Sequence, residues 1–194
     1  MSSFATNLAC NCPGPLLGGL LCVWLLLTSS CSLQRNPVPR NADPEEADAV
    51  AVLRPLAEHI WFDEEGHVKS VDLIGIRATG EVMTAICDLK HLEFLDLCGA
   101  EVFDDQLAVL TRLPRLHSLG LSWTPVSDQG VQHVIKIPSL RLIDLRRTKV
   151  TDQAVELLAT RRDLTHIFLT GSMVTGEGVS RLRNALPNAH IQCK

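Results

Sequence analysis

Apolar residues return along this chain with a period of 24 residues. Between residues 68 and 187 the sequence divides into five blocks, in register and without gaps, that begin at Val68, Leu92, Leu116, Leu140 and Leu164. Each block has apolar residues at positions 1, 4, 6 and 11. The interval of two between positions 4 and 6 is that of a β-strand, whose alternate side chains share one face. Each block therefore predicts a strand near its start.

The second half of each block has apolar residues at helical spacing. In the third block Val131, Val134 and Ile135 are three and four residues apart, which places them on one face of a helix. Ser127 and Asp128 precede this run. A serine is a preferred helix N-cap, and a carboxylate is stabilised at the positive end of the helix dipole. The block therefore predicts a strand, a turn, a helix and a return.

Neighbouring blocks must complete each other's core. One block has an apolar strand face and an apolar helix face and cannot bury both, whereas stacked blocks bury a continuous core. Position 9 carries a small hydroxyl residue in the last three blocks, at Thr124, Thr148 and Ser172. We expect these hydroxyls to face inward and to hydrogen-bond the backbone of adjacent turns.

The pattern LxxLxL, with a small residue at position 9 and an apolar one at position 11, resembles the leucine-rich repeat. Its 24-residue form resembles the repeats of lipoproteins from planctomycete-type bacteria and, more distantly, those of F-box adaptors. The resemblance implies an α/β solenoid, a leucine-rich repeat horseshoe with a parallel β-sheet on the concave face and short helices on the convex face. Two departures stand out: position 9 is Ile76 and Ala100 in the first two blocks, and position 22 is Arg161 where the preceding blocks have Leu or Ile.

The first 31 residues are predicted to be a targeting segment. Residues 1–34 contain no Asp, Glu, Lys or Arg, and residues 16–27 are apolar apart from two glycines. This run suits a signal-peptide core of about 7–15 residues better than a spanning helix of about 20. Small residues then precede Cys31, as in a bacterial lipobox, so Cys31 is the predicted lipidation site. Plain cleaved secretion remains an alternative. An uncleaved anchor is another, and because Arg35 and Arg40 follow the run, the repeats would then face the cytoplasm.

The rest of the chain divides into four parts. Residues 32–47 are polar with three prolines and are predicted to form a flexible linker. Residues 45–67 are predicted to form an N-terminal cap, with a helix and a hairpin strand, because a terminal repeat exposes its apolar end unless it is covered. The five repeats occupy residues 68–187. Residues 188–194 offer one last short strand as a C-terminal cap.

Strand positions 3, 5 and 7 alternate with the core positions and are predicted to point to the concave face. The candidate partner-binding residues are Asp72, Phe94, Asp96, Trp123, Asp144, Arg146, His166 and Phe168. The three carboxylates share position 5, so they suit a basic partner or a hard cation, unless they are only solvated surface. The aromatic residues are candidate binding anchors, unless they merely cover the sheet edge.

No catalytic set, metal site or small-molecule cofactor is predicted. Ser118, Asp144 and His166 come from successive strands about 4.8 Å apart, so about 9.6 Å separates the serine from the histidine, whereas a nucleophile and its base need about 3 Å. No phosphate-binding glycine loop and no zinc-type His/Cys spacing is present. A net charge of −4 argues against a nucleic-acid partner.

The cysteines of the repeats are predicted to be free thiols. Cys87 falls on a convex helix and Cys98 on a strand, so the sheet separates them and a bridge between them is excluded by geometry. With Cys193 near the end of the chain, this predicts three free thiols and no structural disulfide.

Two functions are consistent with these patterns. The first is a non-enzymatic protein–protein interaction or scaffold module, a lipoprotein on the extracytoplasmic side of a bacterial envelope membrane that presents its concave sheet to a protein or peptide. The second is a cytoplasm-facing substrate-recognition adaptor of the F-box leucine-rich repeat kind. The second requires a helical adaptor-binding domain before the repeats, and residues 32–67 are too short and too polar to provide one.

Overall fold

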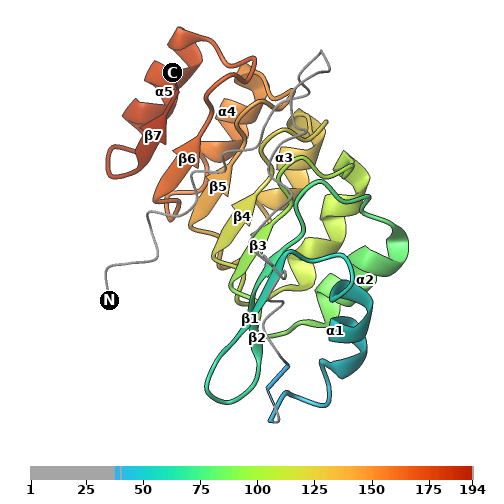
Figure 1. The fold of residues 1–194 in the computed structure, drawn as a ribbon. Coiled ribbons are helices and arrows are strands. Elements are labelled where there is room, and N and C mark those ends of the chain that lie inside the picture. The colour runs from blue at the N-terminus through green and yellow to red at the C-terminus, as the bar shows by residue number, and fades with distance from the viewer. Residues whose placement is uncertain (1–37, 40, 194) are drawn as a thin grey trace, which may run out of the picture.

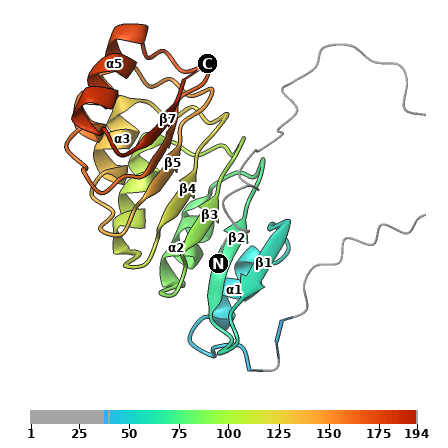
Figure 2. The same ribbon diagram turned by 90° about the vertical axis from the view of Figure 1, so that its left-hand side faces the viewer.

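The computed structural model describes residues 38–39 and 41–193, which form an α/β solenoid of stacked repeats (Figures 1 and 2). In this part of the chain seven strands form one sheet, ordered as in the sequence. The strands are β1 (His59–Phe62), β2 (Val68–Asp72), β3 (Phe94–Asp96), β4 (Ser118–Gly120), β5 (Leu142–Asp144), β6 (His166–Phe168) and β7 (His190–Gln192). The first pair is antiparallel and all later neighbours are parallel.

The helices lie together on one face of this sheet (Figure 2). They are α1 (Ala47–Leu53), α2 (Gly80–Asp88), the 3-10 helix η1 (Asp104–Arg112), α3 (Asp128–Val134), α4 (Asp152–Leu158) and α5 (Gly176–Ala185). Apolar residues at helical spacing, among them Val50, Leu53 and Leu56, would suit a longer helix than α1. Helix α1 ends two residues before Pro55, whose ring cannot continue the i to i−4 hydrogen bonds.

The parallel strands pair with a shift of one 24-residue repeat. Position 4 of each repeat therefore pairs with position 4 of the next, and these buried residues are Val71, Leu95, Leu119, Ile143, Ile167 and Ile191. Together with the apolar helix faces they form one continuous core. Burying each such side chain contributes about 1.5–3 kcal/mol. The pairings confirm the repeat period and the parallel sheet.

The hydroxyl residues at position 12 cap the helices that follow them. Thr79, Ser127, Thr151 and Thr175 each accept a hydrogen bond from an early amide of their helix. The second repeat differs, because Phe103 occupies this place and its side chain has no oxygen to accept such a bond. Its helix η1 is a 3-10 helix, in which the tighter i to i+3 bonds satisfy the amides instead.

Carboxylates at position 13 of repeats two, three and four tie the helix of each of these repeats to the next one. Asp128 accepts hydrogen bonds from the Thr151 amide at 2.8 Å, from the Thr151 hydroxyl at 2.7 Å and from the Ala154 amide at 3.1 Å. The same amide and hydroxyl contacts join the two other pairs, Asp104 with Ser127 and Asp152 with Thr175. Each aspartate therefore helps to start the helix of the following repeat.

Small residues make room for these carboxylates. A Cβ atom at Gly130 would lie 2.5 Å from Asp104 Oδ1, and one at Gly178 would lie 2.3 Å from Asp152 Oδ1. The first repeat has Gly80 instead of an aspartate, and the second repeat accordingly has neither the hydroxyl residue nor the small residue. At each of the four junctions between repeats, the aspartate of one repeat and the hydroxyl and small residue of the next are therefore all present or all absent.

The hydroxyls at position 9 do not bridge repeats as expected. Thr124 Oγ1 donates to Leu121 O at 2.6 Å, and Thr148 Oγ1 donates to Leu145 O at 2.7 Å. Ser172 does the same within its own repeat. The expectation was wrong because the tight turn after each strand brings the carbonyl three residues back within reach of the hydroxyl.

Arg161 replaces an apolar contact with hydrogen bonds. Its Nη1 donates to Ile137 O at 2.8 Å and to Ile135 O, and its Nε donates to Asp163 Oδ1 at 2.9 Å. The hydrogen bond from Arg161 lowers the pKa of Asp163 to about 2, although partial burial of the carboxyl opposes this. The guanidinium thus satisfies carbonyls at the end of helix α3, where a cation is favourable.

The prediction of three free thiols is wrong for Cys98, which is disulfide-bonded. Cys87 and Cys193 are free. The geometric argument excluded only a bridge between Cys87 and Cys98, and that bridge is absent because Cys87 points to Val109 O on the helical side.

Two predictions about the N-terminus, the signal peptide 1–31 and the lipidated Cys31, lie outside the described residues. No helix in the described part of the chain is long and apolar enough to cross a bilayer.

We expect Asp128→Ala to lower the free energy of unfolding by about 2 kcal/mol, because the amides of Thr151 and Ala154 lose their acceptor. Urea unfolding monitored by circular dichroism measures this. The control is Asp105→Ala, which removes an exposed carboxylate from the first turn of η1 and should cost less than about 0.5 kcal/mol. Equal losses in both variants would contradict a specific tie between repeats.

Candidate functional site

The concave face is built from two rows of side chains that run across the sheet. The row at position 3 contains Ser70, Phe94, Ser118, Leu142, His166 and His190. The row at position 5 contains Asp72, Asp96, Gly120, Asp144, Phe168 and Gln192. The remaining candidates are Trp123, three residues after the end of β4, and Arg146, two residues after the end of β5. All eight candidate residues therefore belong to one face or its rim.

The N-terminal end of this face is acidic. Burial and, to a smaller extent, the neighbouring Asp96 carboxylate raise the pKa of Asp72 to about 6, although His59 opposes the shift. Burial also raises the pKa of Asp96, although the Cys98 amide donates to its Oδ1 at 2.9 Å. Two partly buried carboxylates on adjacent strands thus hold their protons more tightly than free aspartates do.

The third carboxylate of the position 5 row is not equivalent to the other two. Asp144 is only 1% exposed, and both of its oxygens accept hydrogen bonds from the Arg146 side chain. Gly120 separates Asp144 from Asp96, and a Cβ atom there would lie 2.5 Å from Asp96 Oδ1. The interpretation of Asp144 as solvated surface is therefore wrong, since Arg146 neutralises and covers it.

The C-terminal end of the face is aromatic and basic. The rings of His166 and Phe168 lie 6.4 Å apart, and each lies about 6 Å from the His190 ring. The Arg146 guanidinium lies over the Phe168 ring at 5.7 Å. Sequence reasoning missed His190, although it lies one 24-residue period after His166.

The rim beside this end carries two residues in an unusual backbone conformation. Position 8 is a glycine with positive φ in three repeats, whereas in the third and fourth repeats Trp123 and Arg147 adopt φ values of 60° and 57°. A left-handed conformation costs a non-glycine residue about 1–2 kcal/mol. The Arg147 guanidinium lies 5.0 Å from the centre of the Trp123 ring, which is 37% exposed. In the sequence, the glycines at position 8 of the other repeats mark Trp123 and Arg147 as departures from the pattern.

The structure does not bring Phe94 to this aromatic group. Phe94 lies on β3 between Ser70 and Ser118, and strands β4 and β5 separate it from His166 on β6. The candidates therefore form two groups: Asp72, Phe94 and Asp96 at the acidic end, and Trp123, Asp144, Arg146, His166 and Phe168 at the aromatic end.

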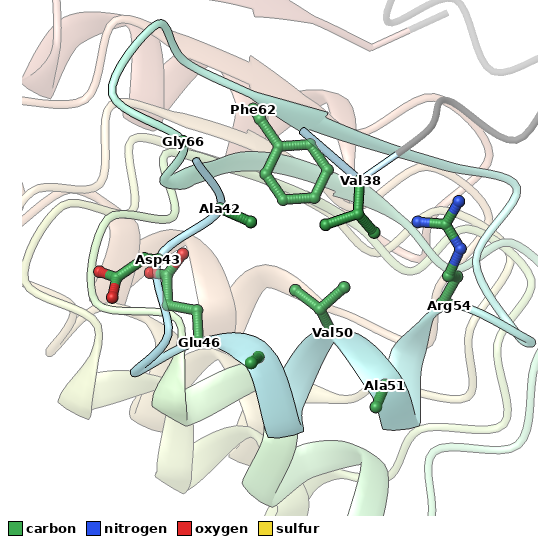
Figure 3. A pocket seen from close by; sticks show the side chains of 10 residues that line it. Val38, Ala42, Asp43, Glu46, Val50, Ala51, Arg54, Phe62 and Gly66 are labelled. Carbon is green, nitrogen blue, oxygen red and sulfur yellow. The ribbon is translucent and has the colours of Figure 1, made fainter. Parts of the chain in front are cut away.

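A separate cavity of about 250 Å³ lies in the N-terminal cap, between helix α1 and the hairpin (Figure 3). Apolar side chains such as Val38, Val50 and Phe62 line most of it. Glu46 also lines it, but its Oε2 accepts a hydrogen bond from the buried Val68 amide at 2.7 Å. The carboxylate thereby fastens α1 to the first repeat strand.

No protein-family model matches the sequence, and no curated protein sequence matches it. Solved structures do resemble it, 91 chains in all. The C-terminal domain of tropomodulin from Caenorhabditis elegans has 14% identity and a TM-score of 0.50, covering 74% of this chain and 92% of that domain. Internalin C2 from Listeria monocytogenes has 13% identity and a TM-score of 0.50, covering 78% of this chain and 74% of its own.

At such identities the likeness concerns the fold alone. Together with the parallel sheet and the convex helices it establishes the fold class, a leucine-rich repeat α/β solenoid.

We expect Asp72→Asn to change how stability depends on pH. The folded pKa of about 6 lies above the ordinary aspartate pKa of 3.8, so the folded state holds this proton more tightly, and wild-type stability falls as pH rises from about 4 to 6. The variant should be more stable than wild type at pH 7, by on the order of 2 kcal/mol, and equal to it below about pH 4. Urea unfolding between pH 4 and 7, with Asp105→Asn as the control for a lost carboxylate, measures this. A constant difference across this range would contradict it.

Proposed function

We propose that this protein is a non-enzymatic interaction module that binds a protein or peptide across its concave sheet, with the main contact on repeats three to five. The observation that carries the proposal is the stacked pair Trp123 and Arg147, held in left-handed conformations beside the Phe168 group. Glycine occupies the same place in the other repeats without that cost.

A non-glycine residue in a left-handed backbone conformation destabilises the fold, so its retention suggests that its side chain has a function. Strained backbone positions cluster at binding and active sites, and tryptophan and arginine are among the residues that contribute most to protein interfaces. The partly exposed ring of Trp123 offers apolar area, and the guanidinium of Arg147 offers donors for a carboxylate or a backbone carbonyl of a partner.

The charge distribution would orient the partner along the sheet. Asp72 and Asp96 lie at the N-terminal end, and Arg147 lies toward the C-terminal end. A bound segment with a basic part over the two carboxylates and an acidic part near Arg147 would satisfy both ends. Like-charge contacts would disfavour the reverse direction.

The contacts of the polar residues support binding rather than hydrolysis. Ser118 and His166 lie on β4 and β6 with β5 between them. Asp144, the acid that would complete a catalytic triad with these two residues, lies on that middle strand and accepts hydrogen bonds from Arg146. A nucleophile and its base must be within hydrogen-bond distance, which this arrangement does not provide.

We expect the pair of substitutions Trp123→Gly and Phe168→Ala to abolish partner capture while the urea midpoint stays close to that of wild type. Trp123→Gly removes the ring and also relieves the left-handed backbone, which offsets lost packing. The control pair is Phe103→Ala and Met173→Ala, two apolar residues that are 59% and 65% exposed and lie outside both rows. Proteins retained from an envelope extract by each immobilised variant, quantified by mass spectrometry, give the comparison. Undiminished capture by the first pair would show that the concave rim is the wrong surface.

We also propose that the protein is a lipoprotein anchored at the extracytoplasmic side of a bacterial envelope membrane. The support is the apolar run 16–27 and the small residues before Cys31. The cytoplasm-facing F-box type of adaptor is the alternative, and it receives no support from the described residues, because α1 is the only helix they contain before the first repeat.

Mass spectrometry of the native N-terminus from the membrane fraction tests this second proposal. We expect a chain that begins at a lipid-modified Cys31, because the segment before it has the features of a cleaved signal peptide. An intact Met1 would contradict the proposal and favour a cytoplasm-facing protein. A Cys31→Ser variant, expected to remain uncleaved, serves as the control for lipobox processing.

A further inference from the structure

Three metal-ligating side chains from separate segments meet at the N-terminal end of the solenoid. Asp43 precedes helix α1, His67 ends the β1–β2 turn, and His91 lies just before β3. One ligand atom from each lies within 4.8 Å of the others, and all three residues are half-buried. His67 Nε2 is 3.7 Å from Asp43 Oδ2, and the two imidazole rings stack at 3.7 Å.

The hydrogen bonds of His67 orient its ring for metal binding. Its Nδ1 lies 3.2 Å from Asp63 Oδ2, and its backbone amide donates to Asp63 Oδ1 at 2.8 Å. When Nδ1–H donates to this carboxylate, the neutral ring carries its lone pair on Nε2, the nitrogen nearest Asp43. Histidine ligands of metals commonly have a carboxylate on their other nitrogen in this way.

The backbone around Asp43 is held in place against the hairpin. The Asp43 amide donates to Gly66 O at 3.2 Å, and Asn41 Nδ2 donates to Glu64 O at 2.9 Å. Gly66 has a φ of 94°, and a Cβ atom there would lie 2.0 Å from Asn41 O. Figure 3 shows Asp43 and Gly66 at the same end of the cap cavity. The carboxylate is therefore brought to His67 by the main chain.

The geometry points to a binding site for a divalent transition-metal ion, with Zn²⁺ as the test ion, formed by Asp43, His67 and His91 and oriented by Asp63. Two imidazole nitrogens and one carboxylate oxygen are a donor set that suits zinc and its neighbours, whereas calcium and magnesium prefer oxygen ligands alone. The site is independent of the concave face and of the function proposed for it.

Binding requires a small rearrangement of side chains. Zinc–nitrogen bonds of about 2.0–2.1 Å imply about 3.4 Å between ligand atoms of a tetrahedral site, so the three ligands must approach by about 1 Å. The two rings are parallel within 7°, and one must turn so that both lone pairs converge. Arg115 donates to His91 Nδ1 at 3.2 Å, so this nitrogen carries a lone pair, and an ion bound there replaces an exposed guanidinium.

The sequence gives no short zinc motif here because the two histidines are one repeat apart. His67 and His91 precede successive repeat strands, so the solenoid stacks them as it stacks the strands. An ion at this place would join the cap segment, the hairpin and the end of the first repeat. It would therefore stabilise the end of the solenoid where the regular stacking stops.

Calorimetric titration of the full chain with Zn²⁺ at pH 7.5, together with thermal unfolding with and without the ion, tests the site. We expect one saturable site and a rise in Tm with Zn²⁺. His91→Ala and Asp43→Asn should each weaken that site at least tenfold and abolish the Tm rise, and Asp63→Asn should weaken it about tenfold. The exposed His117→Ala is the matched histidine control and should bind as wild type does.

Two outcomes of the titration would overturn the site. One is the absence of a saturable Zn²⁺ isotherm in wild type. The other is equal Zn²⁺ affinity in wild type, His91→Ala and Asp43→Asn, which would place the bound zinc elsewhere, for example on the thiols. If His91→Ala does not fold, judged by circular dichroism without metal, the partly exposed Asp43→Asn decides alone. A Tm that responds to pH but not to Zn²⁺ would assign the cluster to proton binding and equally overturn the metal site.

Discussion

Every repeat of this protein depends on its neighbours for the partners of its buried groups. On the concave side the strands exchange backbone hydrogen bonds in a register of one repeat. On the convex side Asp104, Asp128 and Asp152 bond the amide and hydroxyl that start the next helix. Both sets of bonds impose the same 24-residue spacing, so strands and helices cannot shift independently. A solenoid of this kind loses its core when one repeat is displaced.

The same spacing decides how the binding face is composed. Because equal positions fall in one row, most of the face is set by the repeat pattern, and distinct features arise only where a repeat departs from it. Trp123 and Arg147 replace the glycine of position 8, and Gly120 replaces the aspartate of position 5. These departures separate an acidic end from an aromatic end. The proposed binding function rests on the departures and not on the leucines that build the core.

The N-terminal end of the solenoid is organised by polar contacts more than by repetition. Glu46 fastens helix α1 to the Val68 amide, and the β1–β2 hairpin adds an antiparallel strand to the parallel sheet. Asp43, His67 and His91 converge at this place. Exposed strand edges and apolar ends favour association, so the hairpin and helix α1, which cover the first repeat, protect this end of the stack.

The sequence by itself determined the period, the strand and helix positions and the two rows of concave residues, because apolar spacing and helix capping are local properties of the chain. It did not determine which side chains meet. Asp144 is buried under Arg146, and the position 9 hydroxyls donate hydrogen bonds to carbonyls of their own repeat. Cys98 is disulfide-bonded. His67 and His91 stack although 24 residues separate them. Such contacts depend on the spacing between stacked repeats and on the curvature of the solenoid, so only the tertiary structure decided them.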